Sequence, residues 1–505
     1  MSRRRQFWIV VSTTGLAFVL RLINLDGQSL WRDEVDAIRF AFAPVGDLAR
    51  MMFEPGQNGP WYYLFLRPWL TWAGDSEFSL RFFSLFFGVL AVPLIYIVGR
   101  RLFPQRPVVA PIAALLAATS PYLVWYGQEG KMYALVVFLV LLSMERYLAA
   151  LERGGAGRWV VYVASTSAAF YTHLIAAFIV PVQALVFFLG EHPLRIRRWR
   201  PWLVSMLLLT APYLPLLVWQ LPLLVQPGET GFSFVPLHQM AFTLFQSYSR
   251  GVVYGAAWWA LVPFAGLLLA AGLLWRGRSR DRFALGLLLT WILLPVLGLF
   301  LVSLRRPLFT ARYLIFTVPA YCLLLAGGLA AIGRRSRLVA IGLFMVILGL
   351  NGWSLRQQVT TPLKADFRAA TAYVSARLAA EDLIVFQIPY GRHSFDYYYA
   401  EPTEGGPPDP RVQMAHRVLL PWVAGGKREP YRWVDGLYTN AGMAAAEVDR
   451  RMAELTAGSD TVWLVATEVA LWDERDLVHR WLEKNAQRVD EAQFTRVDVY
   501  RYALP

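Results

Sequence analysis

Residues 78–99 read FSLRFFSLFFGVLAVPLIYIVG, a run of twenty-two residues in which Arg81 is the one charged side chain. A run of about 20 apolar residues is long enough for an α-helix to cross the hydrocarbon core of a bilayer. The rest of the chain has the same character, because 56% of its 505 residues are hydrophobic and 17% are charged. An average soluble domain is about 25% charged. The sequence therefore predicts a polytopic α-helical membrane protein.

We predict about eleven transmembrane helices from stretches of this kind. They cover residues 7–25, 78–99, 108–125, 133–150, 159–171, 174–189, 203–221, 256–275, 283–303, 310–331 and 338–354. The first follows three arginines, as a signal peptide would, but no small-residue cleavage site follows it, so we expect it to be retained. The single cysteine, Cys322, excludes an intrachain disulfide.

The net charge of +14 reflects an excess of arginine, and its distribution matters more than its size. In a soluble protein such an excess would suggest a nucleic-acid partner. Here nineteen arginines and three acids lie at the N-terminus and in every second gap between the predicted spans. Because cytoplasmic loops are enriched in Lys and Arg, we predict a cytoplasmic N-terminus, a location in the plasma (inner) membrane and no nucleic-acid partner.

An odd number of spans places the remainder of the chain on the outer face. We therefore predict a membrane domain, 1–354, whose outer loop 26–77 carries an acidic motif, and an extracytoplasmic domain, 355–505. In the second domain we expect helices at 366–380, 443–457 and 473–485, strands at 383–388, 461–467 and 494–502, and a Gly/Pro-rich loop at 401–410. This alternation is typical of a small α/β domain.

Two adjacent carboxylates, Asp33 and Glu34, follow the first predicted span in the stretch SLWRDEVD, residues 29–36. They concentrate negative charge near the membrane surface, close to where a lipid head group lies. A helix N-terminus would favour the same residues, because Asp and Glu stabilise the helix dipole there. The spacing alone leaves both interpretations open.

Two further outer segments carry ionisable groups. The short loop YGQEGKMY, beginning at Tyr126, holds Glu129 and Lys131. These two residues form either a surface ion pair of little energetic value or a functional pair at the membrane edge. His173 lies in the turn YTH, where a lone histidine is more often structural than a ligand. The neighbours of His173 do not decide between these roles.

Arg305, Arg306 and Arg312, with Tyr313, lie at predicted outer ends of two spans, where the positive-inside rule predicts few cations. Three arginines in eight positions indicate an anionic partner, and the planar donor fork of arginine suits a phosphate. Carboxylates and cations on one face could bind a lipid phosphate, stabilise it as a leaving group and deprotonate a hydroxyl group.

An ordered set of motifs then resembles a known family. The motifs are LWRDEVD (30–36), NGPWYY (58–63), the segment 74–99, SPYLVWYGQEGKMYAL (120–135), YTH (171–173) and ARYLIFTVP (311–319). Together they resemble the C-type membrane glycosyltransferases of family 39, which includes protein O-mannosyltransferases and lipid A aminoarabinose transferases. The resemblance covers residues 1–354. It implies a GT-C fold and inverting transfer of a monosaccharide from a polyprenyl-phosphate donor to a hydroxyl group of a protein, lipid or glycan acceptor.

The resemblance also implies roles for single residues. Asp33 matches the general base of the family, and Glu34 beside it orients the acceptor or supports the site. Lys131 stands where relatives usually have arginine. Arg312 matches the Arg-Tyr motif of the family and is our first choice for the donor phosphate. The remaining candidates are Arg305, Arg306 and Tyr313 for the phosphate, and Glu129, His173, Tyr126 and Asn58 for the acceptor or for support. Relatives often have histidine at the position of Asn58 and a small or apolar residue at that of Arg32.

Metal binding and two other functions stay open at this point. Asp33, Glu34 and Glu129 offer oxygen ligands suited to Mg²⁺ or Mn²⁺, and relatives differ in whether they bind a metal. A transporter or flippase of a lipid-linked saccharide would also have many spans, but we would expect ionisable residues in the middle of them. A sensor or adhesion protein would need far fewer spans as an anchor.

Overall fold

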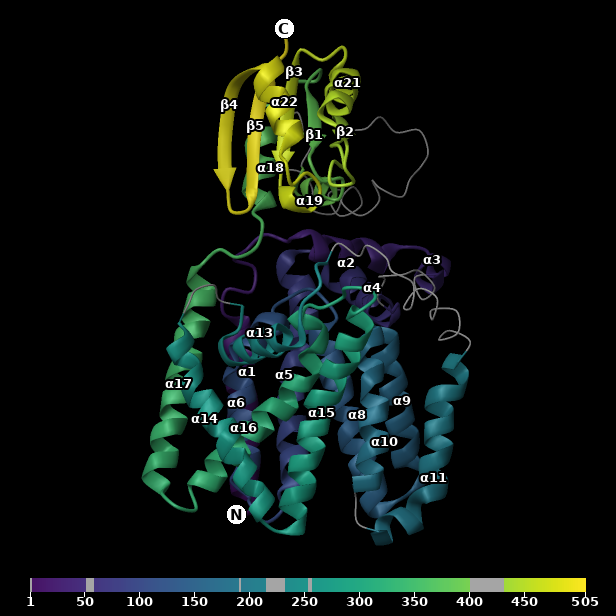
Figure 1. Ribbon diagram of the computed structural model, residues 1–505, viewed down its shortest axis with the longest axis vertical. Helices are drawn as coiled ribbons and strands as arrows, with labels where there is room; N and C mark the ends of the chain where they lie inside the picture. The colour runs from purple at the N-terminus through teal and green to yellow at the C-terminus, as the bar shows by residue number, and fades with distance from the viewer. Residues whose placement is uncertain (1, 51–58, 190–191, 215–231, 253–256, 400–430) are drawn as a thin grey trace. The chain divides into compact units, whose positions relative to one another are not determined.

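The computed structural model describes residues 2–50, 59–189, 192–214, 232–252, 257–399 and 431–505 (Figure 1). The chain divides into two compact units. The membrane unit comprises Met1–Leu25, Pro44–Leu66 and Arg81–Thr361, and the C-terminal unit comprises Asp26–Ala43, Arg67–Leu80 and Pro362–Pro505. The helix that carries Asp33 and Glu34 therefore belongs to the C-terminal unit.

The described part of the membrane unit is helical. Its α-helices are α1 (Arg3–Leu22), α3 (Val45–Arg50), α6 (Val109–Thr119), α7 (Pro121–Gly127), α8 (Tyr133–Arg153), α9 (Ala156–Thr172), α10 (Ile179–Leu189), α11 (His192–Thr210), α13 (Leu237–Arg250), α14 (Val262–Ala271), α15 (Ser279–Ser303), α16 (Val318–Ile332) and α17 (Arg337–Thr360). Helices α4 (Trp61–Ala73) and α5 (Glu77–Leu102) have residues in both units. Short 3₁₀ helices are η1 (Leu174–Phe178), η2 (Ala211–Tyr213), η3 (Trp258–Leu261), η4 (Gly272–Arg276) and η5 (Ala311–Thr317).

Six helices in the described residues are long and apolar enough to cross a membrane. They are Glu77–Leu102, Tyr133–Arg153, Trp258–Arg276, Ser279–Ser303, Ala311–Ile332 and Arg337–Thr360. A seventh span results if α6 and α7, which meet at a bend of 56°, are counted together. The predicted number of eleven is not confirmed. The predicted spans 7–25, 159–171 and 174–189 are helical without reaching that length and hydropathy, and 203–221 extends beyond the described residues.

Helices α16 and α17 differ in burial, because α16 is central in the membrane unit and α17 is peripheral. In Ala311–Ile332, which includes α16, 89% of the most apolar window is buried, whereas the corresponding value for α17 is 17%. Helix α16 packs against α6, α14 and α15 (Figure 1). Helix α17 leaves apolar side chains such as Leu338 and Met345 exposed, by 84% and 60%. Exposed apolar side chains along a span-length helix are expected where a protein faces lipid.

A buried polar network connects α8, α9 and α10. The Gln183 amide donates to Ser143 Oγ at 2.8 Å, and Ser143 Oγ lies 2.6 Å from Thr166 Oγ1. Tyr162 donates to Gln183 Oε1 at 2.9 Å, and Tyr147 donates to the Gln183 backbone carbonyl at 2.6 Å. Side-chain hydrogen bonds between membrane helices contribute about 0.6 kcal/mol each on average. The network therefore fixes the relative rotation of these three helices more than it adds stability.

The C-terminal unit contains a five-stranded mixed sheet of order β2-β1-β3-β5-β4. The strands are β1 (Leu383–Phe386), β2 (Arg432–Asp435), β3 (Thr461–Ala466), β4 (Gln487–Phe494) and β5 (Val497–Ala503). Strand β1 pairs in parallel with β2 and β3, and β5 pairs antiparallel with β3 and β4. The prediction of a small α/β domain is thus confirmed, together with a membrane part built of helices.

Helices cover both faces of this sheet (Figure 1). Leu383 and Val385 of β1 pack with α21 (Ala445–Thr456) and α22 (Leu477–Asn485), while Ile384 and Phe386 pack with α18 (Phe367–Ser375) and α19 (Gly391–Tyr398). A strand buried on both faces is apolar throughout, which is why β1 and β3 are visible in the sequence. The short helix η6 (Val469–Leu471) follows β3.

Four elements of this domain differ from the expectation. The strand expected at 494–502 is interrupted by a turn at Arg496, whose φ is +57°, so that β4 ends at Phe494 and β5 begins at Val497. Strand β4 was missed because its residues are mostly polar and exposed. Strand β2, a four-residue edge strand, and helix α19 were also missed. The loop expected at 401–410 lies outside the described residues.

Segments from the first part of the chain complete the C-terminal unit. Helix α2 (Arg32–Phe42) packs against α19. The Arg368 guanidinium forms an ion pair of 2.7 Å with Glu77, and the Tyr397 hydroxyl donates to the Asp75 carbonyl at 2.8 Å. These contacts join residues from both ends of the segment 26–77 to the sheet domain.

Candidate functional site

The two adjacent carboxylates lie in the first turn of α2 but in different environments. The Glu34 side chain is fully buried, and its Oε1 atom lies 2.9 Å from Lys364 Nζ, which is also nearly buried. The Asp33 side chain is 13% exposed, and its Oδ1 atom lies 3.5 Å from Arg32 Nη2. The helix dipole also stabilises a negative charge at both positions. A helix N-terminus was the other explanation that the sequence allowed for these two acids. Glu34 is therefore neutralised by a buried cation, whereas Asp33 retains access to solvent.

The chain leading into α2 is held by the C-terminal domain. The Ser29 hydroxyl donates to the Ala365 carbonyl at 2.6 Å, and the Leu30 backbone N–H donates to the Tyr398 hydroxyl at 2.6 Å. The Arg32 guanidinium lies over the ring of Tyr390, 4.1 Å from its centre, a cation–π contact. These contacts fix the position of the acid pair within the C-terminal unit.

The second loop that carries candidate residues, 126–131, is buried in the membrane unit. Glu129 is 2% exposed and Lys131 is 6% exposed. The Gln128 amide donates to the carbonyls of Arg21 and Ile23 at 3.1 and 2.7 Å, and Ser84 Oγ donates to the Lys131 carbonyl at 3.0 Å. The loop is therefore bonded to the end of α1 and to α5, so its two charged residues are not part of a solvated surface turn.

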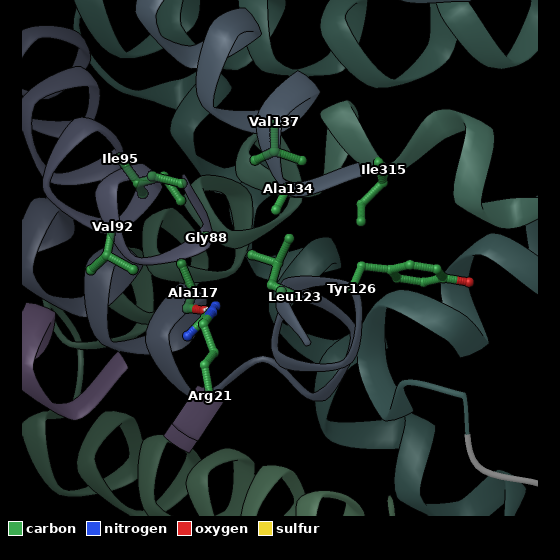
Figure 2. A pocket seen from close by; sticks show the side chains of 12 residues that line it. Arg21, Gly88, Val92, Ile95, Ala117, Leu123, Tyr126, Ala134, Val137 and Ile315 are labelled. Carbon is green, nitrogen blue, oxygen red and sulfur yellow. Dashed lines mark hydrogen bonds between the residues drawn. The ribbon is translucent and has the colours of Figure 1, made fainter. Parts of the chain in front are cut away.

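A buried arginine stabilises the helix break that precedes this loop. Pro121 has no N–H to bond the carbonyl of Ala117 one turn earlier, and the helix breaks between α6 and α7. The Arg21 guanidinium donates to the carbonyls of Ala117 and Ala118 at 3.4 and 3.2 Å. A Cβ atom at Gly127 would lie 2.8 Å from Arg21 Nε, so this glycine makes room for the guanidinium. Figure 2 shows Arg21 beside an otherwise apolar pocket.

A histidine, an arginine and three tyrosines form a connected cluster in the membrane unit. The ring of His173 lies 5.2 Å from that of Tyr313 and 6.2 Å from that of Tyr133. The Arg312 guanidinium is 5.9 Å from the centre of the Tyr133 ring, and Tyr126 contacts Tyr133 at 5.1 Å. Four predicted site residues from three separate motifs, Tyr126, His173, Arg312 and Tyr313, are thus brought together.

His173 is a neutral hydrogen-bonding group at physiological pH. Its side chain is buried, and neither ring nitrogen has a hydrogen-bond partner among the residues that the structure describes. Burial and the nearby Arg312 cation lower the pKa of His173 to about 4. A neutral imidazole has one donor and one acceptor nitrogen. His173 can therefore bond a sugar hydroxyl or a phosphate oxygen without adding charge.

Two other predicted arginines are not joined to this cluster by a side-chain bond within the described residues. Arg305 is exposed and Arg306 is half-buried, and within the described ranges neither side chain makes a hydrogen bond or ion pair. Asn58 lies outside the described residues.

No group of three His, Cys, Asp or Glu side chains suited to a metal ion occurs in the described part of the chain. We derive no step that needs Mg²⁺ or Mn²⁺.

Sequence reasoning missed three residues with clear places at these sites. Lys364 neutralises Glu34, Tyr133 connects His173 to Arg312, and Arg21 supports the break before the second loop. Tyr133 stands within a motif quoted above, so its position next to the loop was a usable signal. Arg21 is a charged residue inside an apolar span, which is itself a functional indication. No signal in the sequence pairs Lys364 with Glu34.

Comparisons with known proteins agree with this architecture. Residues 57–219 match the family model described as dolichyl-phosphate-mannose-protein mannosyltransferase. No curated protein sequence matches the chain significantly. Among solved structures, ArnT from Cupriavidus metallidurans superposes with a TM-score of 0.58 at 14% identity, over 99% of this chain and 98% of ArnT.

Two further structures have the same fold. The oligosaccharyltransferase AglB from Archaeoglobus fulgidus gives a TM-score of 0.56 at 12% identity, over 99% of this chain and 74% of AglB. The arabinofuranosyltransferase AftD from Mycobacteria gives 0.54 at 15% identity, over 100% of this chain and 40% of AftD. The architecture is therefore the GT-C fold of membrane glycosyltransferases. Residues 57–219 are similar to the mannosyltransferase family model, and the chain is similar in fold to ArnT.

Proposed function

We propose that the protein transfers a monosaccharide from a polyprenyl-phosphate donor to a hydroxyl group on an acceptor. The single observation that carries the proposal is the difference between two adjacent carboxylates. Glu34 is buried and paired with Lys364, whereas Asp33 is partly exposed. A general base needs an ionised carboxylate that can reach the proton it removes. Asp33 meets this requirement, and Glu34 supports the first turn of α2.

The fold relatives support the choice of donor. One structure of ArnT has undecaprenyl phosphate bound and superposes on this chain with a TM-score of 0.51 at 15% identity. The AglB structure contains a dolichol phosphate. Both ligands are phosphate esters of a polyprenol. A lipid phosphate of this class is the anion that we assign to the cations of the candidate site.

The proposed reaction is a single displacement at the anomeric carbon of the donor sugar. Asp33 accepts the proton of the acceptor hydroxyl as its oxygen forms a bond to the anomeric carbon. The bond from that carbon to the phosphate oxygen breaks, and polyprenyl phosphate leaves with the bonding electrons. The sugar is transferred with inversion. The developing charge on the phosphate requires a cation, because preorganised donors stabilise such charge in the transition state.

Arg312 and Lys131 are the cations that we assign to the phosphate. Arg312 offers a planar pair of donors, whereas Lys131 offers a point charge. The neutral His173 and the tyrosines that contact it provide hydrogen bonds for the sugar or the phosphate. Glu129, buried two residues before Lys131, is assigned to the acceptor or to support of the loop.

Product analysis tests the proposal. The purified protein is reconstituted in vesicles with a panel of polyprenyl-phosphate sugars and with protein, lipid and glycan acceptors, and the products are identified by mass spectrometry. We expect one donor to yield polyprenyl phosphate and a glycosylated acceptor in equal amounts. Movement of the lipid-linked sugar across the membrane without a covalent product would instead identify a flippase.

A further inference from the structure

The membrane unit contains an open pocket that none of the residues assigned to sugar transfer lines. It has space for about 380 Å³ of solvent and lies where α5 and α8 end and α15 begins. All three helices are long and apolar enough to cross a membrane. The pocket is lined by Ile97, Arg100, Arg101, Pro104, Glu152, Arg153 and Arg280. The distribution of arginine in the sequence predicts that this end of the unit faces the cytoplasm.

Positive charge dominates the lining, since four arginines face one glutamate. Glu152 is shared by two of these arginines. It forms ion pairs with Arg101 and, at 2.5 Å, with Arg280. Glu145, buried nearby on α8, pairs with Arg101 at 2.8 Å. The available carboxylates are therefore already engaged by Arg101 and Arg280.

The other two arginines have no such partner. Within the ranges that the structure describes, the side chains of Arg100 and Arg153 form no ion pair and no hydrogen bond. In addition, the Nε atoms of Arg101 and Arg280 are buried without an acceptor in the same described ranges. The pocket thus presents several donors and an uncompensated charge. An anion with several oxygen acceptors would satisfy both.

The pocket also borders an apolar surface. Ile97 lies one turn before Arg100 on α5, lines the pocket and is 42% exposed. Basic pockets between membrane helices at the cytoplasmic side bind lipid head groups. A free phosphate ion would need only the arginines, whereas a phospholipid also needs an apolar surface for its acyl chains. Ile97 and the apolar α5 supply that surface.

We propose that this pocket binds the phosphate group of an anionic phospholipid, with its acyl chain along α5. The guanidinium groups of Arg100 and Arg153 bond the phosphate oxygens, and Arg101 and Arg280, fixed by Glu152, provide the base of the pocket. The bound lipid would hold together the ends of α5, α8 and α15. The site is separate from the residues assigned to sugar transfer, so the two proposals can fail independently.

Thermal unfolding of the full-length protein in a neutral detergent tests this inference. The unfolding midpoint is measured while phosphatidylglycerol, phosphatidylcholine or inorganic phosphate is titrated. We expect phosphatidylglycerol to raise the midpoint in a saturable way, phosphatidylcholine to leave it unchanged, and inorganic phosphate to act only at far higher concentration. An equal effect of inorganic phosphate would overturn the assignment to a lipid.

Matched variants separate binding from a general effect of charge. We expect R100Q and R153Q each to weaken the apparent affinity for phosphatidylglycerol about tenfold, which is the effect of losing one charge-assisted hydrogen bond. The control, R334Q/R335Q, removes two exposed arginines from the turn between α16 and α17. It should bind as the wild type does. Equal weakening in the control, or none in R100Q and R153Q, would show that these arginines only determine topology.

Discussion

The two units of the molecule surround their candidate site residues differently. In the C-terminal unit, the proposed base Asp33 and its neighbour Glu34 lie beside cations, Arg32 and Lys364. In the membrane unit, Arg312 lies near aromatic rings and beside a histidine that its charge helps to keep neutral. Under the proposed function, the residue assigned as base and the residues assigned to the phosphate belong to different compact units, each with its own set of neighbours. The predictions below alter one environment at a time.

The largest effect is expected for Asp33→Asn in the C-terminal unit. The amide keeps the shape of the side chain but cannot accept the hydroxyl proton, and general base catalysis contributes about 10²–10⁴-fold to a rate. Transfer measured with a polyprenyl-phosphate sugar should fall by about this factor while the unfolding midpoint is kept. Asp36→Asn, on the same helix and paired with Arg39, is the control. Full activity in Asp33→Asn would show that Asp33 is not the base.

Glu34→Gln should act on stability in the same unit. Removing one partner of a buried ion pair leaves an uncompensated charge, here on Lys364, and costs about 3–5 kcal/mol. The free energy of unfolding, measured by denaturant titration, should recover in the double variant Glu34→Gln/Lys364→Met. Glu454→Gln breaks an exposed pair on α21 and should cost less than about 1 kcal/mol. A loss in Glu34→Gln as small as in this control would contradict the buried pair.

Arg312→Gln tests the phosphate-binding role that we assign to the membrane unit. Loss of hydrogen bonds to a charged group, about 1.5–3 kcal/mol, predicts a fall of about 10- to 100-fold in kcat/KM for the donor. Arg312→Lys should recover part of this, because it keeps the charge but not the planar fork. Arg305→Gln changes an exposed arginine and serves as the control. If Arg305→Gln and Arg312→Gln have the same effect, the general charge matters and the position does not.

The smallest effect concerns pH and one histidine in each unit. Burial and neighbouring arginines lower the pKa of His173 to about 4 and that of His393 to about 3. Below pH 6.5 the unfolded chain therefore binds protons that the folded chain does not, so stability falls as the pH is lowered from about 6.5 towards 4. The unfolding midpoints of His173→Gln and His393→Gln, followed by fluorescence, should each depend less on pH than that of the wild type.

Because the two histidines belong to different units, their contributions should add in the double variant. A wild-type acid sensitivity in either single variant would show that the corresponding histidine is already protonated or exposed in the folded state. For His173, the donor KM measured across the same pH range provides a second readout.

The fold class could be predicted because helices in lipid and strands inside a covered sheet have apolar runs of different length. Long apolar runs indicated the membrane helices, and the apolar strands β1 and β3 indicated a sheet covered on both faces. Strand β4 was not predictable in the same way, since an edge strand needs few apolar residues and Gln487–Phe494 has few. In the described residues six helices, or seven with the bent pair, meet the length and hydropathy of a span, so the predicted number of eleven is not confirmed.

The site was only partly predictable for a different reason. Tyr126, His173, Arg312 and Tyr313 were singled out by local sequence, and the structure brings them into one cluster. The ion pair between Glu34 and Lys364 joins residues 330 positions apart. No periodicity or local motif carries information about such a pairing, because it arises only when the sheet domain folds together with helix α2.

The arginine beneath the second loop has an evolutionary consequence. Arg21 occupies space that side chains at Gly88 and Gly127 would need, and it bonds the carbonyl that Pro121 leaves without a partner. These four positions should therefore change together among homologous sequences. In a lineage that replaced the proline, the helix could continue without a break, and the arginine would no longer be needed to bond the carbonyl. Without the arginine, larger residues would fit at both glycine positions.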